Sequence, residues 1–240
     1  MKKITVLNIM LLTLFLSGSY ANADCISGDC ANGTGTFTWK NNDKYQGEWK
    51  ASQREGQGTF TWANGDKYVG QWKNGLYDGQ GTKTWANGDQ YIGLWQSGEM
   101  NGQGVFTWTN GDQYIGLWQN SQMNGQGTKT WVNGNQYVGL WQSGKIDGQG
   151  SYSWANGDKY VGLLKAGERS GQGTFTWANG DQYIGLWQNS LMNGLGTKTW
   201  ANGDQYIGTW KNGLMGGEGT FTWASGDVFA GEFKDGTPQY

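Results

Sequence analysis

The sequence predicts an all-β protein: an elongated, twisted, single-layer antiparallel meander of nine 23-residue β-hairpin repeats with one aromatic-lined face. The first observation behind this prediction is a Gly-x-Gly motif that recurs every 23 residues without an insertion. The second is that each repeat contains two short runs of alternating β-branched and aromatic residues, a pattern typical of strands. The third is an Asn-Gly pair between the two runs, which is typical of a hairpin. The motif begins at Gly33, Gly56, Gly79, Gly102, Gly125, Gly148, Gly171, Gly194 and Gly217.

The composition argues against several classes of function. Glycine supplies 44 of the 240 residues, and charged residues make up only 15% of the chain. Because there is no histidine and there are only two cysteines, the commonest catalytic bases and zinc ligands are missing. A net charge of −2 provides no basic field for nucleic acid or anionic lipid. We therefore expect no enzymatic activity, no cofactor, no metal site, no nucleic-acid partner and no membrane binding.

Residues 1–23 have the pattern of a secretory signal peptide. Lys2 and Lys3 precede a mostly apolar run over residues 4–16, and the segment ends in Ala21-Asn22-Ala23, a small-residue cleavage motif. The apolar run is shorter than the roughly 20 residues that a membrane-spanning helix needs. The pattern predicts export to a periplasm or to the extracellular space, with the mature chain beginning at Asp24.

Residues 24–32 are predicted to form an N-terminal cap closed by a disulfide. Cys25 and Cys30 enclose a short loop, and an even number of cysteines in an exported protein favours a disulfide. The spacing differs from the C-x-x-C motif of redox enzymes, so we prefer a structural bond at the first strand edge. Lipidation of Cys25 is a weaker alternative, because Asp24 precedes it where a lipoprotein signal has a small residue.

Residues 33–240 hold the nine repeats, in which the length of the hairpin loop decides which side chains share a face. In the repeat at residues 56–78, a two-residue loop would divide the aromatic side chains between both faces. A three-residue loop pairs Phe60 with Tyr68 and places Phe60, Trp62, Tyr68 and Trp72 on one face. We expect this loop, because gathering the rings stabilises each repeat by several kcal/mol at roughly 25 cal/mol per Å² of buried apolar surface. Two strands in each of nine repeats give eighteen strands.

The motif Tyr-x-Gly-x-Trp-x-x-Gly-x-x-x-Gly-x-Gly, followed by Gly-Asp, resembles the MORN repeat. One copy extends from Tyr68 and Trp72 to Gly88 and Asp89, and the nine copies cover residues 33–240. The resemblance implies a single-layer sheet of hairpins that serves as a scaffold or binding module, for protein segments and in some members for membrane lipids. The signal sequence makes the chain similar to secreted bacterial MORN proteins. Its acidic charge departs from what lipid binding would need.

The aromatic face is the candidate ligand-binding surface. A single layer cannot bury its whole apolar face, and exposed aromatic stripes often mark binding surfaces. The preferred function is a non-enzymatic scaffold that binds a protein segment in this groove, and the alternative is a module for cell-envelope glycan. A membrane-lipid-associated module is a third, less favoured alternative. The competing interpretation is that most of these rings are only the core of the sheet. The candidate residues are Trp62, Tyr68, Trp72, Lys83, Trp85, Tyr91, Trp95, Trp108, Tyr114, Trp118, Lys129, Trp131, Tyr137 and Trp141.

Charged residues recur beside these rings. Lys83, Lys129 and Lys198 take a position that Phe holds in other repeats, so they either pack on Trp rings through cation–π contacts or contact an acidic ligand. The aspartates of the hairpin loops lie about 9–10 Å apart, too far to share calcium, and are predicted to cap turns. The open edge strands allow two chains to pair edge to edge as a homodimer.

Overall fold

The computed structural model describes residues 24–240, which form twenty β-strands and contain no helix. The predicted signal peptide, residues 1–23, lies outside the described residues. The strands are β1 (Asp24–Gly28), β2 (Thr34–Thr38), β3 (Lys44–Lys50), β4 (Gln53–Thr61), β5 (Lys67–Lys73), β6 (Leu76–Thr84), β7 (Gln90–Gln96), β8 (Glu99–Thr107), β9 (Gln113–Gln119), β10 (Gln122–Thr130), β11 (Gln136–Gln142), β12 (Lys145–Ser153), β13 (Lys159–Lys165), β14 (Glu168–Thr176), β15 (Gln182–Gln188), β16 (Leu191–Thr199), β17 (Gln205–Lys211), β18 (Leu214–Thr222), β19 (Val228–Lys234) and β20 (Thr237–Pro238).

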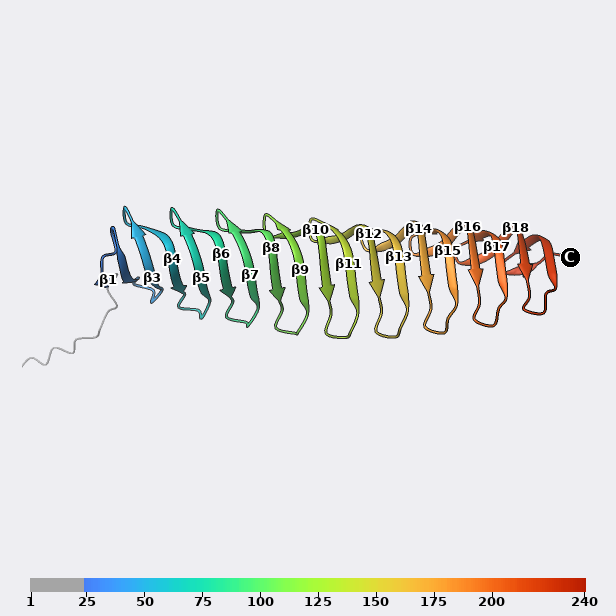
Figure 1. The fold of residues 1–240 in the computed structure, drawn as a ribbon, viewed down its shortest axis with the longest axis horizontal. Coiled ribbons are helices and arrows are strands. Elements are labelled where there is room, and N and C mark those ends of the chain that lie inside the picture. The colour runs from blue at the N-terminus through green and yellow to red at the C-terminus, as the bar shows by residue number, and fades with distance from the viewer. Residues whose placement is uncertain (1–23) are drawn as a thin grey trace, which may run out of the picture.

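Each strand pairs antiparallel with the next strand along the chain, so the strands form one open sheet. Figure 1 shows the strands side by side along the long axis, with β1 at one end and the C-terminus at the other. The predicted single-layer meander is therefore confirmed. The structure has two strands more than expected, because the segments at both ends also pair, as β1 and as the two-residue β20.

Three-residue loops connect each even-numbered strand to the following odd-numbered strand, as predicted. In the loop after β4, the Trp62 N–H donates to the Asp66 carbonyl at 2.9 Å. Phe60 then faces Tyr68 in the ladder. Gly65 has a φ of 96°, and Asn42, which replaces glycine at this loop position, has a φ of 69°. Asparagine is among the non-glycine residues that adopt this left-handed conformation most readily.

Two-residue turns return the chain at the opposite edge of the sheet. Between β5 and β6, Asn74 and Gly75 have φ values of 50° and 80°. Lys73 and Leu76 pair directly across this turn. Positive φ at both central residues is the type I′ geometry, whose twist matches that of the strands it joins. The sheet therefore has a long edge of three-residue loops and a long edge of two-residue turns.

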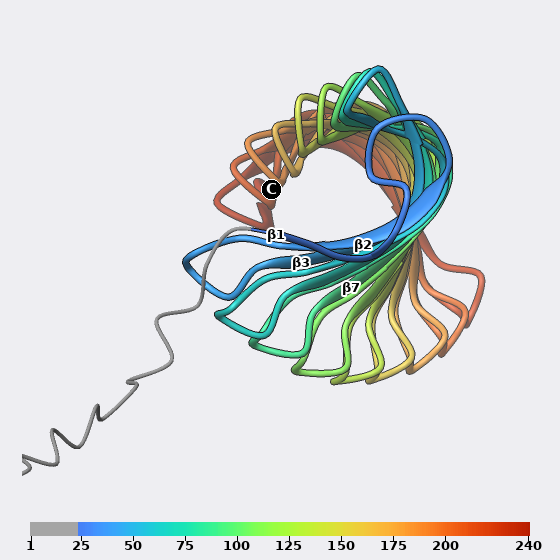
Figure 2. The ribbon, with the colours of Figure 1, turned by 90° about the vertical axis from the view of Figure 1, so that its left-hand side faces the viewer.

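A β-bulge interrupts alternate strand pairs, a feature that was not predicted from the sequence. The register of β5 with β6 shifts between Gly70 and Trp72, whereas β6 pairs with β7 without a shift. Gly79, the first glycine of a Gly-x-Gly motif, lies in this bulge with a φ of 101°. Bulges bend a strand and increase its twist. Figure 2 shows the result, a sheet whose strands turn steadily around its long axis.

The core consists of tyrosines that cover a ladder of glycines on one face of the sheet. Gly116 pairs with Gly127, and the Tyr114 ring lies over both of them. Two Trp rings, Trp118 and Trp141, meet this tyrosine edge to face, with centroids at 5.2 and 5.3 Å. The arrangement recurs along the sheet, except that Leu164 replaces the inner Trp in β13 and that Phe229 and Phe233 replace Tyr and Trp in β19. The fully buried tyrosines are Tyr45, Tyr68, Tyr91, Tyr114, Tyr137, Tyr160, Tyr183 and Tyr206.

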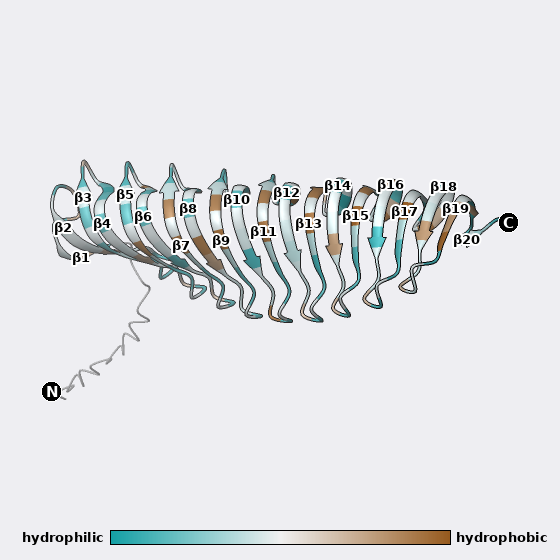
Figure 3. Ribbon diagram, turned by 45° about the vertical axis from the view of Figure 1, so that its right-hand side comes forward, coloured by the Kyte–Doolittle hydropathy of each residue, from teal (hydrophilic) through white to brown (hydrophobic). Residues whose placement is uncertain are grey.

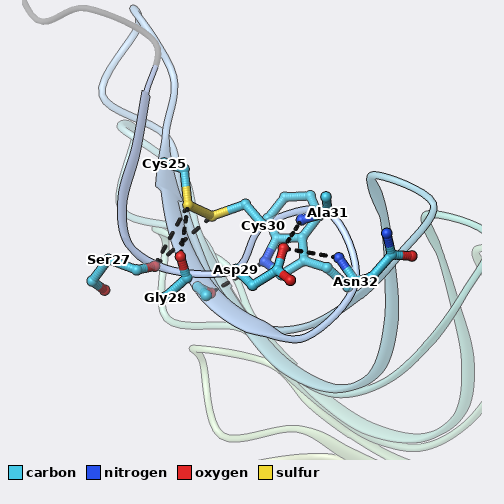
Figure 4. Close-up of a disulfide and its surroundings, with 9 residues drawn as sticks. Cys25, Ser27, Gly28, Asp29, Cys30, Ala31 and Asn32 are labelled. Carbon is cyan, nitrogen blue, oxygen red and sulfur yellow. Dashed lines mark hydrogen bonds between the residues drawn. A yellow bond between two sulfur atoms is a disulfide. The ribbon is translucent and has the colours of Figure 1, made fainter.

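The N-terminal end is closed by the predicted disulfide. Cys25 in β1 is bonded to Cys30 in the turn before β2 (Figure 4). Beside the bond, the Asp29 carboxylate accepts backbone N–H groups of Ala31 and Asn32 at 2.8 and 3.0 Å, and these bonds lower the pKa of Asp29. The disulfide occupies the Cys25 sulfur that lipidation would need.

The face opposite the tyrosines is polar with an aliphatic stripe. Figure 3 shows apolar bands that recur on alternate strands such as β7, β9 and β11. Along the stripe, one Val or Ile per repeat leaves 44–52% of its surface exposed, namely Val69, Ile92, Ile115, Val138, Val161, Ile184 and Ile207. The part of the chain that the structure describes holds no helix with the length and apolar character needed to cross a membrane.

Candidate functional site

A groove lies on the aromatic face between the edge of three-residue loops and the edge of two-residue turns. At the N-terminal repeats it contains a cavity of about 490 Å³, lined by Trp39 and Asp43 from a loop and by Ser52 and Asn74 from turns. The adjoining cavity, of about 310 Å³, has Trp62 among its lining residues. In these repeats, residues from both edges of the sheet therefore line a groove over the aromatic rings.

The base of the groove consists of buried rings. The tyrosines have no exposed surface, and the inner Trp column exposes only 3–6% in the repeats that we singled out from the sequence (Trp72, Trp95, Trp118 and Trp141). The Tyr114 hydroxyl donates to the Leu117 carbonyl at 3.0 Å. Burial raises the pKa of Tyr114 and Tyr137 to about 12. Eight of the fourteen candidate residues thus support the groove from beneath its surface, and a ligand contacts them only if they move.

The remaining candidate residues belong to one continuous stack along the loop edge. Trp62 lies between Phe60, with ring centroids 4.4 Å apart, and the Lys83 ammonium, which is 3.6 Å from its ring centroid. Each repeat adds one Trp and one Phe, Lys or Tyr to this arrangement, which we call the Trp stack. Its members in order are Phe37, Trp39, Phe60, Trp62, Lys83, Trp85, Phe106, Trp108, Lys129, Trp131, Tyr152, Trp154, Phe175, Trp177, Lys198, Trp200, Phe221 and Trp223.

The Trp residues of the stack are partly exposed, and their indole N–H groups differ from those of the inner column. Aromatic neighbours in the stack are tilted against one another by 31–59°. In the inner column, Trp72 donates its indole N–H to the Gly58 carbonyl at 3.2 Å. No indole N–H of the Trp stack has a hydrogen-bond partner within residues 24–240. The buried indole N–H without a partner in this part of the chain is that of Trp118, in the inner column. Each repeat therefore presents one indole donor that reaches solvent.

The three lysines of the stack are held by the aspartate of the preceding loop. Lys83 Nζ lies 3.9 Å from Asp66 Oδ2. Burial lowers the pKa of Lys83, and Asp66 partly offsets this effect. The same pairing recurs in two other repeats, for Lys129 with Asp112 at 4.0 Å and Lys198 with Asp181 at 3.6 Å. These contacts support the packing interpretation of the lysines over contact with an acidic ligand.

Where the stack residue is not lysine, the preceding loop residue finds a different partner. Before Phe60, the Asp43 Oδ2 atom accepts a hydrogen bond from the Asn41 side chain at 2.9 Å. Before Tyr152, the loop residue is Asn135, whose side-chain amide donates to the tyrosine hydroxyl at 3.4 Å. The alternation of Phe, Lys and Tyr along the stack is therefore matched to the loop residue of the previous repeat.

Each loop carboxylate also connects its loop to the next one. Asp89 Oδ1 accepts the Thr109 N–H at 2.8 Å, and Asp89 Oδ2 accepts from the Asn87 side chain at the same distance. These two bonds lower the pKa of Asp89. The predicted turn cap is instead an asparagine, as in Asn64, whose side-chain oxygen accepts the Asp66 N–H at 3.0 Å. Assigning that role to the aspartates was wrong, since they bridge loops. Within residues 24–240, no group of three or more His, Cys, Asp or Glu side chains is placed to hold a metal ion.

Two arginines at the turn edge were not predicted as site residues. The Arg54 guanidinium lies 4.4 Å above the Trp72 ring and donates to the Gly75 carbonyl at 2.7 Å. Burial lowers the pKa of both Arg54 and Arg169, which occupies the same position five repeats later. They are the only arginines in the sequence, and they stand where other repeats have Tyr, Met or Ile. That break in the repeat was the signal that could have identified them.

Several solved structures resemble this sheet weakly. The SAS-4 (dCPAP) TCP domain of Drosophila melanogaster, solved with a proline-rich motif of Ana2 (dSTIL), is 12% identical, with 72% of this chain and 88% of that chain covered and a TM-score of 0.40. The TCP10 domain of Danio rerio CPAP is also 12% identical, with 84% and 94% covered and a TM-score of 0.35. Virginiamycin B lyase from Staphylococcus aureus is 7% identical, with 88% and 73% covered and a TM-score of 0.18. At these scores the likenesses carry no functional argument. None of the curated proteins compared with the chain matches it.

The MORN repeat is found in nine consecutive segments of the chain. They are residues 31–44, 45–67, 68–90, 91–113, 114–136, 137–159, 160–182, 183–205 and 206–228. From the second segment onward, each begins at a buried tyrosine of the core and includes the glycine and the inner-column Trp that follow it, except that Leu164 takes the place of this Trp in 160–182. The matched segments span residues 31–228 without interruption, so the chain belongs to the MORN repeat family.

Proposed function

We propose that this protein is an exported, non-enzymatic MORN scaffold that binds a protein segment along the groove of its aromatic face. The observation that carries the proposal is the groove itself, whose rims come from opposite edges of one sheet and enclose a half-buried Trp stack. Every repeat adds one Trp and one Phe, Lys or Tyr to the stack. A linear array of equal subsites suits a linear ligand better than it suits a small molecule.

The half-buried members of the stack are the contact residues in this proposal. Trp62, Trp85, Trp108 and Trp131 are partly exposed, whereas the tyrosines beneath them are not. We assign the tyrosines and the inner Trp column to support, because rigid packing below a site holds the contact groups in place. Lys83 and Lys129 contribute their stems to the stack and keep their charges on the loop aspartates.

The chemistry of the exposed groups favours a peptide over a glycan. Sugars stack on the faces of aromatic rings, and at Trp62 the Phe60 ring and the Lys83 ammonium already lie against the indole. Ring edges carry the positive part of the aromatic quadrupole. Together with the free indole N–H groups they attract carbonyl oxygens, and a peptide backbone supplies one carbonyl for every residue.

Two observations support export. The disulfide between Cys25 and Cys30 suits an oxidising compartment. Residues 1–23 have the sequence pattern of a signal peptide, and its removal would take two lysines and change the net charge from −2 to −4. That acidic charge supports a protein partner over an anionic membrane surface. N-terminal sequencing of the protein from the cell envelope or the medium should begin at Asp24, and an intact Met1 would contradict export by cleavage.

Site-specific photo-crosslinking tests the groove. The photoreactive residue p-benzoylphenylalanine replaces Trp108 in the stack and, as the control, Ile115 on the opposite face. Each purified variant is irradiated in an envelope extract of its own source cells, after treatment of the extract with protease or with glycan-degrading enzymes. We expect crosslinks from position 108 that protease abolishes and that map by mass spectrometry to one segment of a partner. Equal crosslinking from both positions would refute the groove, and loss only after glycan digestion would replace the protein segment with a glycan.

A further inference from the structure

The repeat spacing of the groove matches one backbone conformation of a peptide. Equivalent groups in neighbouring repeats are two strand spacings apart, about 9.6 Å. A polyproline II helix has three residues per turn and advances about 9.3 Å per turn. It would therefore present the same side of its backbone to every repeat. An α-helix advances about 5.4 Å per turn, and an extended strand alternates its side chains every second residue, so neither returns to the same orientation at this spacing.

The free indole groups supply the hydrogen bonds that such a ligand lacks. A polyproline II helix has no internal hydrogen bonds, so all of its backbone carbonyls need external donors. The Trp stack presents one indole N–H per repeat that is neither bonded within residues 24–240 nor buried. At three residues per repeat, each donor meets the carbonyl of every third residue. Proline itself has no N–H, so a proline-rich segment brings few donors that would need acceptors in the groove.

The loop aspartates add a charge pattern along the same edge. Three of them, Asp66, Asp112 and Asp181, are paired with lysines of the stack. Four others precede a phenylalanine of the stack, and within residues 24–240 they have no lysine or arginine within 4.0 Å. Amide groups hold their carboxylates in place. These four, in order, are Asp43, Asp89, Asp158 and Asp204, which are separated by two, three and two repeats.

We propose that the groove recognises a basic, proline-rich segment in the polyproline II conformation, a proposal that rests on the function assigned to the groove above. Prolines face the edges of the Trp stack, and backbone carbonyls accept the indole N–H groups. Lysine or arginine side chains of the segment meet the four carboxylates that have no lysine or arginine within 4.0 Å in residues 24–240. At three residues per repeat, these basic residues are about six, nine and six positions apart in the segment.

The test uses synthetic peptides and a variant in which two lysines of the protein itself pair with two of these carboxylates. The probe is a fluorescent proline-rich peptide of about 24 residues with four arginines at the predicted spacing. One control peptide has the prolines replaced by glycine, and another has the same composition with the arginines evenly spaced. The variant Phe106→Lys with Phe175→Lys places a lysine at the stack position that follows Asp89 and Asp158, as in three natural repeats. The control Ile115→Lys with Ile184→Lys adds the same charge to the opposite face.

Binding is measured by fluorescence anisotropy with the purified full-length protein. We expect the predicted spacing to bind best, and we expect the groove variant to lose about three- to fivefold in affinity for each carboxylate, or about tenfold in total. The opposite-face variant should change affinity less than twofold. Circular dichroism establishes that both variants fold. Equal losses in the two variants, or equal binding of the glycine peptide, would overturn the proposal. If position 108 crosslinks to a partner but no peptide binds, the proline-rich ligand is refuted and the groove remains a binding site for a protein segment. If neither crosslinking nor peptide binding is seen, both proposals are refuted.

Discussion

Replacing Gly127 with alanine should destabilise the sheet far more than replacing a turn glycine does. Gly127 lies directly beneath the Tyr114 ring, and an added Cβ would lie 2.5 Å from ring carbons Cε2 and Cζ. The ring cannot shift sideways, because Trp118 and Trp141 meet it at 5.2 and 5.3 Å. The substitution therefore expels the tyrosine from the core or separates the strands β9 and β10.

The cost follows from the surface that the tyrosine buries. A buried tyrosine covers about 150–250 Å², which corresponds to about 4–6 kcal/mol at roughly 25 cal/mol per Å². Its hydroxyl also donates to the Leu117 carbonyl at 3.0 Å, which contributes about 1 kcal/mol. Since the ring keeps part of its contacts after it moves, we expect a loss of about 3–5 kcal/mol in the free energy of unfolding.

The control is Gly144→Ala in a two-residue turn. Gly144 has a φ of 79°, and a Cβ there would meet no atom within 4 Å, so only backbone strain of about 1–2 kcal/mol remains. Guanidinium unfolding followed by Trp fluorescence gives both values, and hydrogen exchange locates the loss in β9 to β11. The double variant Tyr114→Ala with Gly127→Ala should cost little more than Tyr114→Ala alone. Equal costs for Gly127→Ala and Gly144→Ala, or additive costs in the double variant, would refute the reasoning.

Three further predictions concern pH, the stack and the disulfide. Burial raises the pKa of a set of tyrosines to about 12 (Tyr114, Tyr137, Tyr160 and Tyr183). Because the unfolded value is about 10, the native state holds more protons, and stability should be lost as the pH rises from about 10 to about 12. Circular dichroism and tyrosinate absorbance should then change together, and ionisation of a folded chain would contradict this. Lys129→Met should lower the free energy of unfolding by about 1–2 kcal/mol, because it removes the cation–π contact with Trp108 and the ion pair with Asp112. Lys129→Phe should cost less than half as much, and equal costs would count against the stack. Reduction of Cys25–Cys30 should cost about 2 kcal/mol, with faster hydrogen exchange confined to β1 and β2; faster exchange beyond β4 would show that the cap stabilises the whole sheet.

The fold was predictable because the repeat length and the alternation of side chains between the two faces of the sheet lead to the same arrangement of strands. The 23-residue period fixes the succession of hairpins, and the requirement that Phe60 and Tyr68 share a face fixes the loop length. A slip of one residue would send all the rings to the other side of the sheet. Asn42, which stands at the loop position that glycine holds in the other repeats, has a positive φ as well.

The bulge and the stack were not predictable from local patterns. Residues around Gly79 alternate like a strand, and nothing in that alternation shows that two strands of unequal length must pair there. The stack joins residues about one repeat apart, such as Trp62 and Lys83, whose contact depends on the twist of the sheet. Sequence reasoning gathered the right rings on one face, but it could not separate the buried tyrosines from the half-buried Trp rings above them.

The contacts between neighbouring repeats explain how a single-layer sheet can hold its ligand-binding groups at a fixed spacing. Neighbouring repeats are joined through the Trp stack and through a tyrosine between two inner Trp rings, except beside Leu164. They are also joined through a loop side chain that accepts the next loop's N–H, as Asp89 does from Thr109 and Asn135 from Ala155. These links fix the spacing of the exposed groups before any partner arrives. A ligand that matches the spacing then loses only its own freedom, which is small for a segment already in the polyproline II conformation. A segment whose spacing does not match contacts one or two subsites well and can reach the others only in a strained conformation. Affinity should therefore depend on the number of consecutive repeats that a segment matches, so the length of the sheet is itself a determinant of specificity.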